Sequence, residues 1–122
     1  MRELLAAMKA LADENRLRVV SALDGRELCL CQIVELLGLA TSTVSRHISI
    51  LHQARLVESR KDGRWTYFRV DENAPKEVAA ALEAAIAGLK RDSVARVDSR
   101  RLKEILKLDP EAPCRSQSEC KG

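Results

Sequence analysis

Two short segments with helical hydrophobic periodicity lie on either side of a single glycine, Gly38, and this arrangement limits the folds open to the chain. The apolar residues of the two segments recur three or four positions apart: Ile33, Leu36 and Leu37 before the glycine, and Val44, Ile48 and Leu51 after it. Glycine readily takes the left-handed conformation that ends a helix and turns the chain. We expect Thr41 or Ser42 to cap the second helix. The pattern therefore predicts a helix-turn-helix unit.

Further helices are expected on both sides of this unit. Residues 3–12 carry apolar side chains at helical spacing, and Asp13 is placed to cap the helix that follows. On the other side, Pro75 opens a helix rich in alanine, and a last helix is expected over residues 98–107. The alanine-rich surface, together with the first helix, predicts either a dimer interface or an ordinary core contact, and the pattern alone does not separate the two.

The periodicity changes after Leu56. Two β-prone runs, 57–60 and 65–70, flank an Asp-Gly pair, which is a strong signal for a hairpin turn. Alternation along the second run places Phe68 and Val70 on the side that we expect to face the core. Helices followed by such a hairpin predict a mainly α fold with a β-hairpin wing, a winged helix-turn-helix.

The length of 122 residues fits one main domain. We assign residues 1–92 to the winged helix-turn-helix domain, with the helices at its two ends available for dimerisation. Residues 93–122 are expected to form the C-terminal helix and a mobile tail that contains two cysteines.

Positive charge is concentrated in and around the expected hairpin. Residues 40–70 hold six basic and two acidic residues, whereas the rest of the chain holds one more acidic residue than basic ones. A basic segment is typical of a surface that binds phosphate, although it is also common on solvated faces. The side chains placed to bind a double-stranded DNA operator lie in the helix after Gly38 and at the hairpin tip: Thr41, Ser42, Thr43, Ser45, Arg46, His47 and Arg64.

Composition and missing motifs exclude several functions. The sequence has no run of about 20 apolar residues and no export signal at its start, so we expect a cytoplasmic protein with no membrane partner. It has no glycine-rich phosphate loop and no nucleophile elbow, and its two histidines, His47 and His52, point in different directions along one helix. We therefore expect neither an enzyme nor a catalytic cofactor. A thiol oxidoreductase using Cys29 and Cys31 is a remote alternative that lacks a βαβ context.

Four segments resemble, in the same order, motifs of the arsenical-resistance (ArsR/SmtB) family of metal-responsive repressors. Residues 10–18 resemble the entry to the family's second helix, residues 27–31 its metalloid-binding box, residues 39–51 its recognition helix and residues 62–70 its wing. The resemblance covers residues 3–90. It implies a homodimeric repressor that binds a palindromic operator and releases it when an inducer binds.

Cys29 and Cys31 of the box predict a site for an ion that prefers sulfur, such as trivalent arsenic or antimony. In a regular helix two residues at this spacing point about 200° apart. Their sulfurs can therefore converge only where the chain is not yet helical. Binding both thiolates to one ion would distort the helix before Gly38, shift the recognition helix and release DNA. The alternative is that both cysteines are small buried residues.

A third thiolate is expected from elsewhere in the chain. Family members with the full box often have a cysteine at the position of Val34, and we consider Cys114 or Cys120 as its replacement, from the same chain or its partner. Arsenite or antimonite is therefore the predicted inducer, with oxidants, cadmium or lead as alternatives for the same repressor. Residues 75–90 contain no histidine or aspartate, so we do not expect the zinc site that other family members carry on this helix.

Overall fold

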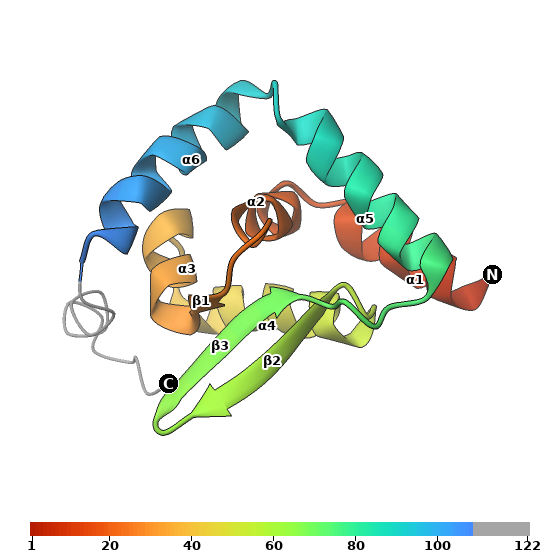
Figure 1. The fold of residues 1–122 in the computed structure, drawn as a ribbon, viewed down its shortest axis with the longest axis horizontal. Coiled ribbons are helices and arrows are strands. Elements are labelled where there is room, and N and C mark those ends of the chain that lie inside the picture. Colours follow the sequence, from red (N-terminus) through yellow and green to blue (C-terminus); the bar gives the residue numbers. More distant parts are fainter. Residues whose placement is uncertain (109–122) are drawn as a thin grey trace.

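The computed structural model describes residues 1–108, which form the winged helix-turn-helix predicted from the sequence (Figure 1). The elements in chain order are α1 (Arg2–Leu11), α2 (Glu14–Ala22), β1 (Leu28–Cys29), α3 (Leu30–Leu37), α4 (Thr41–Gln53), β2 (Val57–Asp62), β3 (Trp65–Val70), α5 (Lys76–Leu89) and α6 (Ser93–Leu106). The predicted mobile tail, with Cys114 and Cys120, lies outside the described residues. No helix over residues 1–108 is long and apolar enough to cross a membrane.

The turn between α3 and α4 depends on Gly38, as predicted. This residue has φ 67° and ψ 27°, and its N–H donates to the carbonyl of Val34. A side chain is disfavoured in that left-handed conformation. The expectation that Thr41 or Ser42 caps α4 was wrong. The residue before the helix is Ala40, which makes no side-chain cap, and α4 has already begun at Thr41.

Helix caps explain where two other helices begin. Asp13 caps α2 by accepting a hydrogen bond from the N–H of Arg16 at 3.1 Å, as predicted. Helix α6 begins at Ser93, five residues earlier than expected, because Asp92 accepts hydrogen bonds from the N–H groups of Val94 and Ala95. In its first turns Val94 and Val97 are exposed and the buried residue is Asp98, so the apolar pattern that faces the core did not mark this start.

The wing belongs to a three-stranded antiparallel sheet with the order β1-β3-β2. Asp62 pairs with Trp65 across the predicted turn, so β2 reaches further than expected. Phe68 and Val70 pack against the core, as predicted. Strand β1 was not expected, because two residues are too short to show an alternation.

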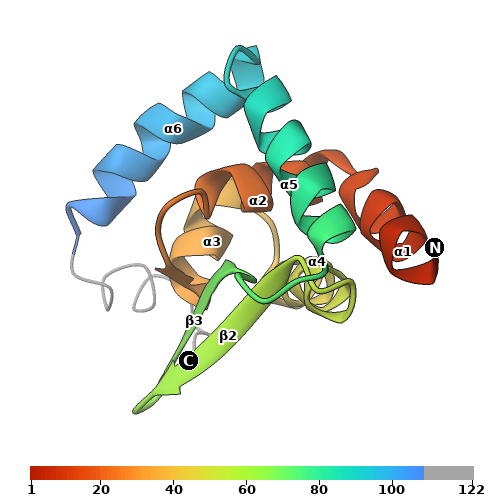
Figure 2. The ribbon, with the colours of Figure 1, turned by 45° about the vertical axis from the view of Figure 1, so that its right-hand side comes forward.

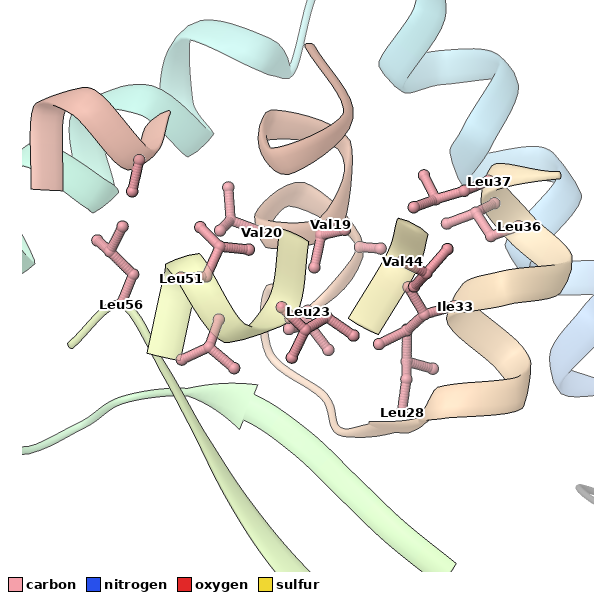
Figure 3. Close-up of a cluster of buried hydrophobic side chains, with 14 of the residues drawn as sticks. Val19, Val20, Leu23, Leu28, Ile33, Leu36, Leu37, Val44, Leu51 and Leu56 are labelled. Atoms are coloured by element: carbon pink, nitrogen blue, oxygen red, sulfur yellow. The ribbon is translucent and has the colours of Figure 1, made fainter. Parts of the chain in front are cut away.

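Helix α2 lies at the centre of the molecule. Its side chains meet those of α3, α4 and the start of the sheet in one apolar cluster (Figure 3), whose labelled members are Val19, Val20, Leu23, Leu28, Ile33, Leu36, Leu37, Val44, Leu51 and Leu56. Helices α5 and α6 form an arch over α2, with α1 beside α5 and α6 beside α3 (Figure 2). The wing extends from the opposite side. Because α4 packs on both α2 and α3, a shift of α3 changes the support of α4.

Candidate DNA-reading surface and thiol site

Helix α4 presents a polar face to solvent because its apolar stripe is buried. Val44, Ile48 and Leu51 face the core. The exposed residues among the predicted DNA contacts on this helix are Ser42, Thr43, Ser45 and Arg46, and Thr41 is half-buried at its start. Short hydroxyl side chains and a guanidinium group are the donors and acceptors that read base edges and phosphates.

Arg64 lies at the tip of the wing, in the two-residue turn between β2 and β3. Its side chain is exposed, and its guanidinium carbon lies 5.5 Å from the centre of the Trp65 ring. A cation at the end of a projecting hairpin can reach phosphates beside those that α4 would contact. We call the predicted contacts on α4, together with Arg64, the DNA-reading surface.

His47 differs from the other members of this surface. Its side chain is only 14% exposed, and its Nδ1 atom lies 3.3 Å from Nη1 of Arg16 and 4.0 Å from Oδ1 of Asp13. Burial by itself would raise the pKa of Asp13, but the Arg16 N–H and the charges of Arg16 and His47 hold it below its ordinary value. Both partners of His47 belong to the start of α2. His47 therefore fixes α4 against α2, a contact between elements that sequence spacing does not show.

The thiol site consists of Cys29 and Cys31, at the junction of β1 and α3. Cys29 has an extended backbone, with φ −80° and ψ 161°, and it directly precedes α3, whereas Cys31 lies in the first turn of that helix. The N–H of Cys29 donates to Oε1 of Gln32 at 3.0 Å. The chain at Cys29 is thus not helical. The two sulfurs can converge only where the chain is not yet helical, and the backbone at Cys29 meets this requirement.

The two sulfurs are in different chemical states. Both cysteines are 1% exposed. Burial raises the pKa of the Cys29 thiol, and hydrogen bonds from neighbouring N–H groups offset this only in part, so the free thiol is protonated at neutral pH. Cys31 is disulfide-bonded, whereas Cys29 is free. Cys31 is therefore available as a ligand only after reduction.

The described residues supply no further metal ligand to this site. Over residues 1–108, no group of three or more histidine, cysteine, aspartate or glutamate side chains is close enough to hold a metal ion. Val34, at the position where a third cysteine was considered, is a buried core residue of α3. Cys29 and Cys31 thus fit a soft ion by their chemistry but do not complete a three-sulfur set.

An ion pair beside the thiol site was missed by the sequence reasoning. Nε of Arg60, in β2, lies 3.0 Å from both carboxylate oxygens of Glu27, and its Nη2 also donates to Glu27. The Glu27 pKa is lowered, first by the hydrogen bond from Arg60. The pairing depends on β1, because that strand brings Glu27 alongside the wing. Without β1 in the predicted fold, no sequence signal connected these two residues.

Comparison with known proteins identifies the family. The family described as "Bacterial regulatory protein, arsR family" matches residues 13–59. The arsenic resistance transcriptional regulator ArsR1 of Pseudomonas putida is 35% identical over 70% of this chain and 70% of its own length. The cadmium resistance transcriptional regulatory protein CadC of Listeria innocua is 41% identical over 49% of this chain and 51% of its own length.

A solved structure agrees with this assignment. The homodimeric winged helix-turn-helix DNA-binding domain of Mb0332 from Mycobacterium bovis, described as a possible ArsR-family transcriptional regulator, is 28% identical. It matches 75% of this chain and 83% of its own with a TM-score of 0.59. The oxidoreductase alternative is therefore set aside. The chain belongs to the arsR family of bacterial regulatory proteins and is a DNA-binding transcriptional regulator rather than an enzyme.

Proposed function

We propose that the protein is a homodimeric repressor that leaves its operator when a thiophilic metalloid, arsenite or antimonite, binds Cys29 and Cys31. The observation that carries this proposal is the position of Cys29. It ends β1 and directly precedes α3, the helix on which α4 packs. A ligand that draws the two sulfurs together acts on the start of α3 and through it on α4. The names of two relatives, an arsenic and a cadmium regulator, support a thiophilic inducer.

Once a thiol reductant has reduced Cys31, the chemistry at the thiol site balances without an oxidant or a base. Arsenite is the neutral trihydroxide at neutral pH. As each As–S bond forms, an As–O bond breaks, and the thiol proton leaves with the hydroxide as water. The protonated state of Cys29 is therefore a suitable starting state. Cys114 or Cys120 is the proposed source of a third sulfur, because the described residues offer none.

We assign DNA binding to the DNA-reading surface and dimerisation to α1 and α5. Helix α1 exposes two large apolar side chains, Leu5 at 50% and Met8 at 54%, and it lies alongside α5. Apolar groups that remain exposed in one chain favour contact with a partner. The homodimeric state of Mb0332 supports this assignment, and a two-fold dimer would match a palindromic operator.

The proposal is tested by measuring operator binding with and without arsenite. The duplex is the DNA upstream of the protein's own gene, and the protein is fully reduced. We expect arsenite to weaken binding by about 5- to 150-fold, the usual range for coupled sites. Cys29→Ser should bind DNA as the wild type does and remain bound in arsenite. If Cys29→Ser is released like the wild type, the thiol site is not the sensor.

A second inducer class is favoured by the disulfide at Cys31. An oxidant that forms this disulfide would change the first turn of α3 in the absence of any metal. Peroxide, cadmium and arsenite should therefore be compared in the same release assay. If peroxide releases DNA from the wild type and from Cys29→Ser but not from Cys31→Ser, that result identifies an oxidant sensor. Release by arsenite that requires both cysteines would identify the metalloid sensor.

A further inference from the structure

The segment that carries Cys29 is joined to the wing as well as to α3. In the sheet, Cys29 pairs with Tyr67 of β3, and Tyr67 pairs with Arg60 of β2. These residues form one row across the three strands. Because paired strands move together unless their hydrogen bonds break, a displacement of Cys29 acts on β3.

The ion pair of Glu27 and Arg60 forms a second link between the thiol segment and the wing, and Arg60 belongs to the row just described. Glu27 lies two residues before Cys29, and its carboxylate receives a two-pronged contact from Arg60. The Arg60 guanidinium also lies 4.8 Å from the centre of the Tyr67 ring, so one side chain contacts both the thiol segment and β3. Two-pronged contacts fix orientation as well as distance. Glu27 and Arg60 thus hold the wing in a defined position relative to Cys29.

We infer that Glu27 and Arg60 are positioning residues that transmit ligand binding at Cys29 to the wing, in parallel with the path through α3 and α4. The inference rests on the proposed function for the identity of the ligand, but the connection itself rests on β1 and the ion pair. Movement of the wing carries Arg64 at its tip. Release of DNA then involves both parts of the DNA-reading surface, the helix and the hairpin.

The test compares two glutamates of similar exposure that form ion pairs with different arginines. Glu27→Gln weakens the link between the thiol segment and the wing. Glu58→Gln is the matched control, because Glu58 accepts from Arg69 at 2.5 Å within the hairpin and has similar exposure, 23% against 29% for Glu27. The readout is the ratio of operator affinities without and with arsenite, which a purely structural role would not change.

We expect Glu27→Gln to reduce this ratio by up to about five-fold, the most that an exposed ion pair contributes to an equilibrium. Glu58→Gln should leave the ratio unchanged. Reversing the ion pair, with Glu27→Arg and Arg60→Glu in one chain, should restore part of the affinity ratio that Glu27→Gln loses. Equal ratios in the wild type and both single variants would overturn the inference, as would equal reductions in the two variants.

A spectroscopic arm separates this inference from the identity of the inducer. Trp65 is the single tryptophan of the chain and lies in β3, two residues from Tyr67, so its emission reports on the wing. Mercuric ion is added to the reduced full chain until the thiols are titrated, with Cys29→Ser as the reference. We expect an emission change that depends on Cys29 and is smaller in Glu27→Gln. If the Trp65 emission responds to mercuric ion but not to arsenite, arsenite is rejected as the inducer, and the link from Cys29 to the wing is kept. If mercuric ion causes no emission change that depends on Cys29, the link from Cys29 to the wing is overturned.

Discussion

The protonation state of Cys29 separates the candidate inducers. Burial raises the pKa of this thiol, so it carries its proton throughout the neutral range. A divalent cation such as cadmium must displace that proton, whereas arsenite removes it as water. The same residue therefore gives the two ligands different dependences on pH.

We predict that cadmium binding tightens about ten-fold per pH unit for each thiol that loses a proton, as long as the pH stays below the thiol pKa. Arsenite binding should be nearly independent of pH over the same range. Titrations of DNA release at several neutral pH values measure both slopes. A steep slope for arsenite would contradict the exchange of hydroxide for thiol proposed above.

Arg46 is the residue of α4 whose removal tests the DNA-reading surface most directly. Its side chain is exposed in the N-terminal half of the helix. Arg46→Ala should cost about 1–3 kcal/mol of operator binding if Arg46 contacts a base, and the cost should depend on the base at that position. Arg100→Ala, which replaces an exposed arginine of α6, removes the same charge from another helix and is the control. Equal losses in the two variants would indicate a general charge effect.

At the scale of elements, the sequence reasoning succeeded where one chain segment carries its own signal. Gly38 marks the turn of the helix-turn-helix, Asp13 marks the start of α2, and the Asp-Gly pair marks the hairpin. It failed where a partner segment defines the element. Strand β1 exists because β3 lies beside it, and His47 faces α2 because that helix packs against α4. Neither contact leaves a periodicity in the sequence.

A shielded ion pair joins helix α6 to α2, in addition to the core packing of Leu102 and Ile105. Nε and Nη2 of Arg18, in α2, lie 2.8 and 3.1 Å from the two carboxylate oxygens of Asp98, whose exposure is 8%. The same ion pair holds the pKa of Arg18 above its ordinary value, first through the hydrogen bond to Asp98. Nη2 of Arg101 also donates to the carbonyl of Glu35 at 2.9 Å, so α6 contacts the end of α3 as well.

We predict that Asp98→Ala lowers the free energy of unfolding by about 2 kcal/mol, because Arg18 loses its charged partner in a shielded position. Glu104→Ala on the same helix is the control, since Glu104 pairs with Lys107 where both side chains are mostly exposed, and this pair should contribute nothing measurable. Urea unfolding followed by circular dichroism measures both. A similar loss in the two variants would show that α6 depends on helix propensity rather than on the ion pair.

At the scale of the molecule, apolar surface is distributed unevenly. Large exposed apolar side chains occur on α1, at Leu5 and Met8, and on α6, at Val94, Val97 and Leu106. Only the first pair lies next to the alanine-rich helix α5. Small side chains let another helix approach closely, which suits α1 and α5 to a shared interface.

Met8→Glu should therefore convert the dimer to a monomer and weaken operator binding, because a charge in a closed apolar interface loses its hydration. Val97→Glu is the control: it places the same charge at a site of equal exposure, 56% against 54%, on α6. Analytical ultracentrifugation gives the oligomeric state of each variant. A monomer produced by Val97→Glu, with a dimer retained by Met8→Glu, would move the interface to α6.

The shortness of β1 has an energetic consequence. Two residues join the thiol segment to the sheet, so separating these two residues from β3 disrupts a small part of the backbone hydrogen bonding. Such local opening requires only a fraction of the roughly 5–15 kcal/mol that holds a domain folded. A ligand at Cys29 therefore needs little binding energy to loosen the thiol segment from β3, while the ion pair of Glu27 and Arg60 still connects that segment to the wing. The regulator can pass between its DNA-bound and released states repeatedly while its core of α2, α3 and α4 stays folded.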